Sequence, residues 1–194
     1  MANAPLDTTL LDRAILFAVK AHAGTERRGK GFPYIVHPME AMEIVATMTS
    51  DQELLAAAAL HDTVEDTCVT VEDLREGFGE RIAAIVAAES DSVVEGLSEE
   101  ESWLARKQAG IDRLRGASLD VKMVALGDKL SNMRAIARDY EAKGDALWSL
   151  FHSTDPREHA WRYRSLADAL RDLEGTSAFR EFESLVEKVF GKWK

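Results

Sequence analysis

The segment His61-Asp62-Thr63-Val64-Glu65-Asp66 concentrates ionisable side chains in a short stretch of the chain. On one helix, the four ionisable positions fall within an arc of roughly 140°, so the sequence predicts that they share one side. The apolar residues 56–60 just before the segment predict that this side is buried. Buried carboxylates repel one another unless a cation or a basic group offsets them. The segment therefore indicates a cation-binding cluster; the alternative is a solvated acidic surface with a capping histidine.

His37 stands between Pro33 and Pro38, where an extended apolar segment leads into a predicted helix. The positive end of a helix dipole disfavours a protonated histidine, and a metal ligand must be neutral. This position therefore suits a metal-binding imidazole. For His37 taken alone, the alternative is a buried core histidine bonded to a backbone carbonyl.

Asp128 and Asn132 lie four residues apart on another predicted helix, directly after the apolar residues 123–126. An aspartate in that position is expected to point into the protein. Four residues then form a mixed nitrogen and oxygen set that suits Mn²⁺, Fe²⁺ or Zn²⁺, namely His37, His61, Asp62 and Asp128. With four protein ligands, an octahedral ion keeps positions for water and a phosphate oxygen, as metal-assisted hydrolysis requires.

The elements that position these residues are predicted to be helices. The four prolines are Pro5, Pro33, Pro38 and Pro156, which leaves residues 39–155 free of any residue that must break a helix. Apolar residues at three-to-four spacing predict helices near residues 10–24, from 38 past 45, after a cap at Ser50 or Asp51, and over 81–89, 103–115, 119–140, 155–173 and 179–189. Thr70 and Asp73 resemble a capping box that opens a further short helix. No strand pattern, repeat or linker is evident, so we expect one all-α domain over residues 1–194.

The charge balance limits the possible partners. The chain has 24 Lys and Arg residues against 34 Asp and Glu residues, a formal net charge of −10. This charge argues against general affinity for nucleic acid or for anionic membranes. An anionic ligand must therefore find local positive charge, for which the candidates are Arg27, Arg28, Lys30, Lys129, Arg134 and Arg138.

The single cysteine, Cys68, allows no intrachain disulfide, as expected for a reducing compartment. Residues 1–24 show neither a signal peptide nor a membrane span. We therefore expect a cytoplasmic protein. The sequence carries no signal for an oligomeric state.

Three motifs in this order resemble one known family. They are GFPYIVHP at residues 31–38, HDTVED at 61–66 and GDKLSNMR at 127–134. Together they are similar to the metal-dependent HD-domain hydrolases of the RelA/SpoT type, which hydrolyse nucleotide alarmones. The length of 194 residues resembles that of a stand-alone small alarmone hydrolase rather than of the long members with a nucleotidyltransferase domain.

The resemblance implies an HD-domain helical bundle of about ten helices that binds a small nucleotide and holds Mn²⁺ through His37, His61, Asp62 and Asp128. It also implies that Glu65 and Asp66 orient and deprotonate the attacking water. By the same resemblance, Arg28 stacks on the base and Asn132 contacts the nucleotide. The implied reaction removes the 3′-diphosphate of ppGpp or pppGpp and releases pyrophosphate with GDP or GTP.

The loop departs from the family pattern next to Arg28. Relatives commonly carry a second basic residue at the position of Gly29, whereas this chain has Lys30 one place later, which we take as a substrate-binding residue. This departure leaves open adenine alarmones such as pppApp, NADPH or nucleotide monophosphates as substrates. A catalytically silent nucleotide-binding domain is the non-enzyme alternative.

Overall fold

The computed structural model describes residues 6–89 and 99–193, and within them every regular element is a helix. The elements are α1 (Thr9–Ala21), α2 (Val36–Ala46), α3 (Gln52–Leu60), α4 (Thr63–Asp66), α5 (Val71–Phe78), α6 (Glu80–Glu89), α7 (Glu99–Arg115), α8 (Leu119–Lys143), the 3-10 helix η1 (Gly144–Leu150), α9 (Pro156–Ala169), the 3-10 helix η2 (Arg171–Leu173) and α10 (Ser177–Phe190). In these residues the single β-bridge joins Glu26 to Pro33 in the loop before α2. The predicted all-α fold is therefore confirmed. None of the helices described here has the length and apolarity needed to cross a membrane.

Local hydrogen bonds explain where several helices begin. Asp51 accepts a hydrogen bond from the Glu53 backbone N–H at 2.9 Å and caps α3. Thr70 and Asp73 form the predicted capping box at the start of α5, each side chain accepting from the other's backbone N–H. These caps satisfy N–H groups that have no partner inside the helix, so they fix where α3 and α5 begin.

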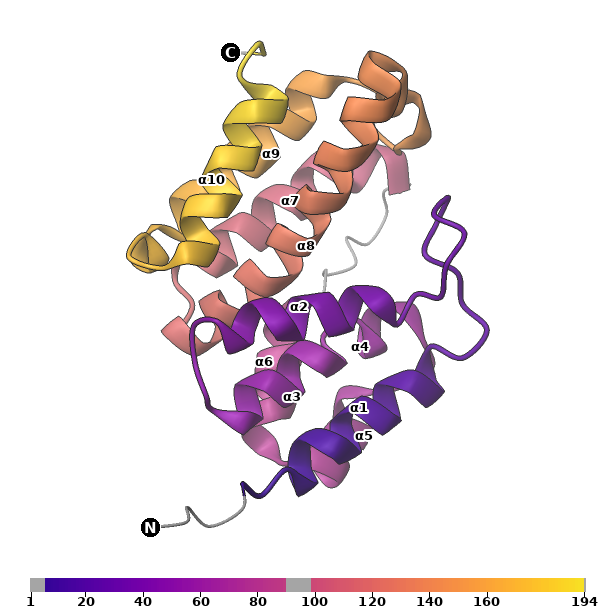
Figure 1. The fold of residues 1–194 in the computed structure, drawn as a ribbon, viewed down its shortest axis with the longest axis vertical. Coiled ribbons are helices and arrows are strands. Elements are labelled where there is room, and N and C mark those ends of the chain that lie inside the picture. The colour runs from indigo at the N-terminus through magenta and orange to yellow at the C-terminus, as the bar shows by residue number, and fades with distance from the viewer. Residues whose placement is uncertain (1–5, 90–98, 194) are drawn as a thin grey trace.

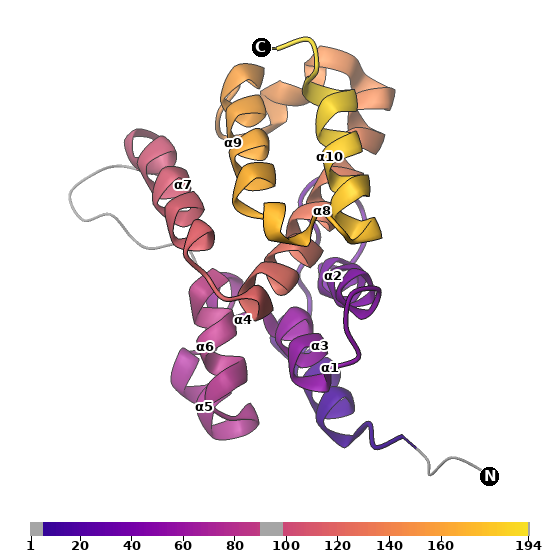
Figure 2. The same cartoon turned by 90° about the vertical axis from the view of Figure 1, so that its left-hand side faces the viewer.

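Helix α8 connects the two halves of the molecule (Figure 1). Helices α1 to α6 occupy one half, whereas α7, α9 and α10 occupy the other. The same arrangement is visible from the side, where α8 runs obliquely between the two groups (Figure 2). Leu126, Leu130 and Met133 of α8 are fully buried between these groups. Helices α2 and α10 both pack along α8, so it contacts elements from both ends of the chain.

The carboxyl-terminal half of helix α3 is buried on all sides. Its residues Ala56, Ala57, Ala58, Ala59 and Leu60 have no exposed surface. The small alanine side chains let α1, α2, α6 and α8 pack closely around α3. As a result, the carboxyl end of α3 delivers the next residue, His61, into the core.

Gly127 lets α2 and α8 approach closely beside the predicted ligands. A Cβ atom at this position would lie 2.7 Å from the carbonyl oxygen of Ala41 and 2.7 Å from Cγ2 of Val45, both on α2. Contacts this short require the backbone of one helix to move. Gly127 thus sets the spacing between the helix that carries His37 and the helix that carries Asp128.

Helices α9 and α10 form a packed pair. Tyr163 of α9 stacks on Phe190 of α10 with ring centroids 5.6 Å apart and an interplanar angle of 17°. Phe182 of α10 lies 6.2 Å from the same tyrosine ring. This aromatic packing buries the inner faces of both helices near α8.

Replacing Gly127 with alanine is expected to lower the free energy of unfolding by about 1–3 kcal/mol, because the added methyl group overlaps the backbone of α2. Urea denaturation followed by circular dichroism measures this change. The control is Gly77→Ala in α5, where no atom lies within 4 Å of the new Cβ. There we expect no loss, or a gain of up to about 1 kcal/mol from helix propensity. Equal stability of the two variants would contradict the close-approach explanation.

Candidate metal centre

His61 and Asp62 lie at a break between two helices, not on one continuous helix as the sequence predicted. Helix α3 ends at Leu60, and the one-turn helix α4 begins at Thr63. The hydroxyl of Thr63 donates to the carbonyl oxygen of Leu60 at 2.7 Å, and His61 Nδ1 lies 2.8 Å from the carbonyl oxygen of Ala58. Side chains therefore take over carbonyl groups that backbone N–H groups would use in a continued helix. The break turns His61 and Asp62 toward α2 and α8.

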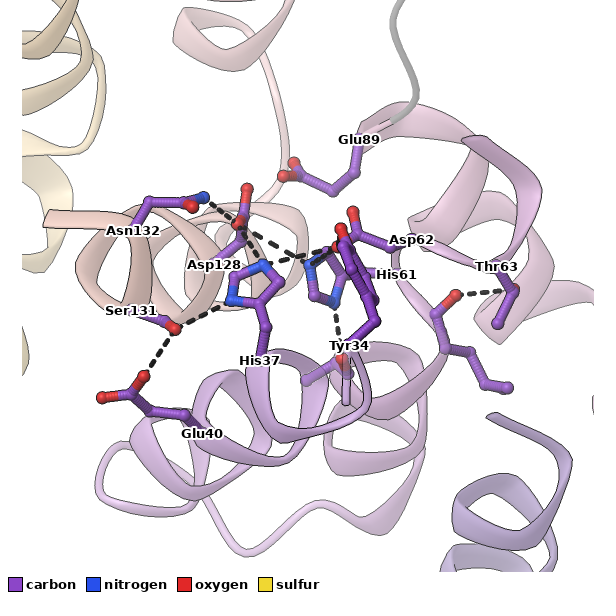
Figure 3. Close-up of polar contacts among 12 residues, drawn as sticks. Tyr34, His37, Glu40, His61, Asp62, Thr63, Glu89, Asp128, Ser131 and Asn132 are labelled. Atoms are coloured by element: carbon purple, nitrogen blue, oxygen red, sulfur yellow. Dashed lines mark hydrogen bonds and ion pairs between the residues drawn. The ribbon is translucent and has the colours of Figure 1, made fainter. Parts of the chain in front are cut away.

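The two histidines each hold one ring nitrogen away from a common centre. His37, in the first turn of α2, places Nδ1 2.8 Å from the hydroxyl oxygen of Ser131. His61 uses Nδ1 for the carbonyl of Ala58. Both imidazoles are only 3% exposed. Their Nε2 atoms consequently face the space between Asp62 and Asp128 (Figure 3).

The four predicted metal ligands converge in the structure. Oδ2 of Asp62 lies 3.3 Å from His37 Nε2 and 3.1 Å from His61 Nε2. Oδ1 of Asp128 lies 3.1 Å from His37 Nε2 and 3.7 Å from His61 Nε2. One donor atom from each of His37, His61 and Asp128 lies within 4.8 Å of the other two. Residues from three separate parts of the chain thus meet at one point.

The geometry of this cluster fits a divalent cation. His61 Nε2 is buried and makes no hydrogen bond within the described residues, although two carboxylate oxygens lie close to it. Atoms that point at a shared centre rather than at one another are what ligation by one ion requires. Two imidazole nitrogens and two carboxylate oxygens also form a donor set that suits first-row transition metals.

Charge neutralisation dominates the electrostatics of the cluster. Burial alone raises the pKa of Asp62, but the neighbouring imidazoles outweigh burial and hold that pKa well below its usual range. The pKa of Asp128 is lowered as well, because Lys129 and the two imidazoles outweigh its burial. Burial lowers the pKa of His61, yet the two aspartates raise it well above the ordinary value. A divalent ion would take over this compensation by replacing the proton on His61.

Tyr34 supports Asp62 from the side of the loop before α2. Its hydroxyl donates to Asp62 Oδ2 at 2.6 Å, and its ring stacks on His22 with centroids 4.8 Å apart. Burial and the carboxylates of Asp62 and Asp66 raise the pKa of Tyr34, so this hydroxyl stays protonated as a donor. The stacked rings therefore fix a hydrogen-bond donor against one carboxylate of the cluster.

Lys129 faces two carboxylates at the other side of the cluster. Its ammonium group pairs with Asp128 Oδ2 and lies 3.6 Å from Oε2 of Glu89. Glu89 points toward the cluster (Figure 3), and burial raises the pKa of its carboxyl group. Lys129, a sequence candidate for holding an anionic ligand, is thus already paired within the cluster.

A cavity of about 680 Å³ adjoins the cluster. Tyr34 and Asn132 line it, and both bond to aspartates of the cluster: Tyr34 to Asp62, and Asn132 to Oδ1 of Asp128. Its charged lining residues are Arg27, Arg28, Lys30, Lys143 and Arg162 on the cationic side and Asp139 on the anionic side. Despite the negative net charge of the chain, this cavity is strongly cationic. An anionic ligand requires such local positive charge, because the chain as a whole is negative.

The predicted substrate-binding residues Arg28, Lys30 and Asn132 all line this cavity. Arg28 is exposed and forms no ion pair within residues 6–89 and 99–193. Lys30 pairs with Asp139 of α8. Asn132 accepts a hydrogen bond from Nη2 of Arg27 at 2.5 Å. The structure therefore brings the loop before α2 and helix α8 together as two walls of one cavity.

The predicted catalytic residues Glu65 and Asp66 lie on α4, the helix that begins immediately after Asp62. Both are exposed. Asp66 lies close enough to Tyr34 to affect the pKa of its hydroxyl, which places this carboxylate near the cluster.

Sequence reasoning missed several residues that support the site. Ser131 and Glu40 contact each other and hold His37, and Asp139 lies opposite Lys30 in the cavity. Spacing along the helices offered a signal for Ser131 and Glu40. Ser131 lies three residues after Asp128, and Glu40 lies three residues after His37. Tyr34 likewise precedes His37 by three residues. Asp139 had no such signal.

Comparison with protein families places this arrangement of motifs in a known group. A family model described as an HD domain matches residues 14–152. The chain belongs to the HD-domain family. The match includes the two histidines and two aspartates of the cluster together with Glu65, Asp66 and Asn132.

The names of two relatives of this HD domain refer to guanine nucleotides. A GTP pyrophosphokinase of Brucella ovis is 33% identical over 139 residues, which cover 68% of this chain and 17% of that protein. A guanosine-3′,5′-bis(diphosphate) 3′-pyrophosphohydrolase of Aquifex aeolicus is 41% identical over 86 residues, covering 44% of this chain and 12% of that protein. The chain thus spans less than a fifth of the length of either relative.

Two solved structures share the fold of this HD domain. One is described as a metazoan ortholog of SpoT that hydrolyses ppGpp; it superposes with a TM-score of 0.73 at 25% identity and covers 97% of this chain and 98% of its own. The other, lmo0812 from Listeria monocytogenes, gives a TM-score of 0.70 at 28% identity over 83% of this chain and 98% of its own. The resemblance to RelA/SpoT-type HD proteins is therefore confirmed.

Replacing Tyr34 with phenylalanine is expected to lower the free energy of unfolding by about 1.5–3 kcal/mol, because the carboxylate of Asp62, which is only 15% exposed, loses a hydrogen bond. Urea denaturation of the metal-stripped protein at neutral pH measures the loss. Tyr140→Phe is the matched control, since its hydroxyl bonds to the exposed Asp145 at 3.0 Å. We expect that control to stay within about 0.5 kcal/mol of the wild type. A Tyr34→Phe variant as stable as this control would show that the hydroxyl does not support Asp62.

Proposed function

We propose that this chain is a metal-dependent phosphohydrolase that removes the 3′-diphosphate of ppGpp or pppGpp. The observation that carries the proposal is the cluster of two imidazoles and two aspartates beside a cationic cavity. The names of the Aquifex relative and of the metazoan structural neighbour support the same reaction. We further propose that residues 1–194 act as one domain, because α8 packs against both α2 and α10. The single cysteine fits a location in the reducing cytoplasm, which we also propose.

The proposed metal ligands are His37, His61, Asp62 and Asp128. Mn²⁺ is the ion we propose, since mixed imidazole and carboxylate ligands suit it. When bound, such an ion supplies a Lewis acid that polarises a phosphoryl oxygen and lowers the pKa of water. The buried cluster would hold it at the end of the cavity where Asn132 and Tyr34 lie.

Glu65 and Asp66 are the proposed proton acceptors. The oxygen of water bonds to the phosphorus attached to O3′, the bond between that phosphorus and O3′ breaks, and pyrophosphate leaves. Water gives up one proton to the carboxylate pair, and the pair passes this proton to O3′ as the bond breaks, so O3′ ends as a hydroxyl group. The exposed position of both carboxylates on α4 leaves them accessible to water.

The cationic lining of the cavity favours a substrate with several phosphate charges. Arg27 is held in place by Asn132 and by the Tyr34 ring, over which its guanidinium carbon lies 5.2 Å from the centroid. Arg28 has its guanidinium plane available for stacking on a base. Lys143 and Arg162 add charge farther along the wall. An ordinary monophosphate would use only part of this charge.

The pair Lys30 and Asp139 favours guanine over adenine. Guanine presents the acceptor O6 beside the donors N1–H and N2–H₂, whereas adenine presents the donor N6–H₂ beside the acceptor N1. A lysine donor next to a carboxylate with two acceptor oxygens can bond to all three guanine groups, which is one group more than adenine presents on this edge. This arrangement supports guanine alarmones ahead of pppApp or NADPH.

Removing a ligand and removing the base are expected to have different effects. Asp128→Ala should abolish both Mn²⁺ binding in calorimetry and pyrophosphate release from ppGpp, because it deletes a proposed ligand. Glu65→Gln should keep Mn²⁺ and ppGpp binding while lowering kcat by about 10²- to 10⁴-fold, as expected for loss of general-base catalysis.

The matched controls for these variants are Asp145→Ala and Glu72→Gln, which change exposed residues paired on other helices. Both should behave as the wild type. Metal-dependent hydrolysis that survives Asp128→Ala would overturn the ligand set, and loss of metal in Glu65→Gln would make that residue a ligand. If the wild-type chain with Mn²⁺ binds ppGpp but never cleaves it, the chain is a nucleotide-binding domain instead.

Asp139→Asn is expected to reduce the preference for guanine over adenine substrates. One well-placed pair of hydrogen bonds contributes about 1–3 kcal/mol of base discrimination, so the kcat/KM ratio of pppGpp to pppApp should fall roughly 5- to 150-fold. Asp112→Asn, which alters an exposed pair with Arg115, is the control. An unchanged ratio would show that Asp139 does not read the base, whereas a higher ratio would assign it to adenine.

A further inference from the structure

A chain of hydrogen bonds continues behind His37, on the side away from the ligand cluster. The hydroxyl of Ser131 lies 2.8 Å from His37 Nδ1 and donates to Glu40 Oε2 at 2.8 Å. Nη1 of Arg134 donates to the other oxygen of Glu40 at 3.3 Å. Figure 3 shows this sequence of contacts from His37 through Ser131 to Glu40.

The number of protons available along these hydrogen bonds determines which ring nitrogen of His37 carries a hydrogen. A serine hydroxyl has one proton, and a carboxylate can only accept. Because Ser131 gives its proton to Glu40, its oxygen must accept from His37, so Nδ1 carries a hydrogen. The neutral ring then has its lone pair on Nε2, which is the atom that faces Asp62 and Asp128.

The two histidines of the cluster are therefore held by different means. His61 is fixed by the main-chain carbonyl of Ala58, which no side-chain substitution removes. His37 depends on two side chains, one on its own helix and one on α8. Ser131 is 1% exposed, so solvent cannot easily replace it.

The same series of hydrogen bonds extends to helix α10. Arg134 binds Glu181 of α10 through two hydrogen bonds, Nε to Oε1 at 2.7 Å and Nη2 to Oε2 at 2.8 Å. One guanidinium group thus connects Glu40 on α2 to α10. The helix near the carboxyl terminus is linked in this way to the orientation of a ligand on α2.

We propose that Ser131 and Glu40 are positioning residues that hold His37 in the Nδ1–H form, with Nε2 directed at the metal. The proposal rests on the proposed metal-dependent function. Partners of this kind typically contribute 10- to 100-fold to metal affinity, because they fix the tautomer and the ring orientation of the ligand. We call the hydrogen-bonded series His37, Ser131 and Glu40 the relay. Arg134 bonds to Glu40 and to Glu181, and so anchors the relay to α10.

The test measures metal binding rather than turnover. We expect Ser131→Ala in the full, chelator-stripped chain to weaken Mn²⁺ binding by about 10- to 100-fold, measured from the electron paramagnetic resonance signal of the free ion. The visible absorption of bound Co²⁺ should change with it, because the geometry at His37 relaxes. Ser118→Ala is the matched control: Ser118 caps the same helix through Val121 N, so its loss affects stability but not the cluster.

Glu40→Gln is a second variant with nearly unchanged shape. Its amide can donate to Ser131, which frees the hydroxyl proton to point at His37 Nδ1 and favours the wrong tautomer. We expect weaker Mn²⁺ binding here too, and a smaller loss in Glu181→Gln, which alters only the anchor. If Ser131→Ala does not fold, Glu40→Gln decides the question.

The outcomes separate this inference from the proposed function. If the wild-type chain binds no divalent ion, the proposed metal-dependent function fails. If the wild type binds Mn²⁺, and Ser131→Ala or Glu40→Gln binds it as tightly with an unchanged Co²⁺ spectrum, the relay has no positioning role and the function still stands. A loss of affinity in Ser118→Ala equal to that in Ser131→Ala would also overturn the relay, because general destabilisation would then explain both.

Discussion

Two aspartates and two imidazoles buried at one point impose the main constraint on this fold. Removing a carboxylate from water costs several kcal/mol, so these groups can share a buried site only with balanced charge and satisfied hydrogen bonds. The imidazole of His61 provides that balance for both aspartates, and a divalent ion can replace its proton. The alanines of α3 and the absence of a side chain at Gly127 allow three helices to come close enough for this contact.

Features that depend on neighbouring residues could be read from the sequence. The caps at Asp51 and Thr70 were predicted because their hydrogen bonds span two or three residues. The four ligand positions were predicted from residue type and context, and they do converge. The prediction of a single helix through His61 was wrong. Periodicity does not reveal that the side chains of Thr63 and His61 hydrogen-bond to carbonyl groups of the preceding turn.

Contacts between distant residues could not be predicted in the same way. The pair Lys30 and Asp139 joins residues 109 positions apart, and Ser131 meets Glu40 across 91 positions. Neither pair forms a pattern along the chain, since each depends on how α8 lies against α2 and its preceding loop. Residue type identified which side chains can do chemistry, but only the packing of α8 shows which of them act together.

Helix α8 carries residues of the proposed metal site, of its hydrogen-bonded support and of the proposed substrate cavity. Asp128 and Ser131 face the cluster and His37, while Asn132 and Asp139 face the cavity. Asp128 and Asp139 are separated by about three helical turns, or roughly 16 Å along the axis. A phosphate at the cluster and a base beside Lys30 would span a distance of this order. Because both ends are set by one buried helix, a shift of α8 relative to α2 would disturb ligation and substrate recognition together.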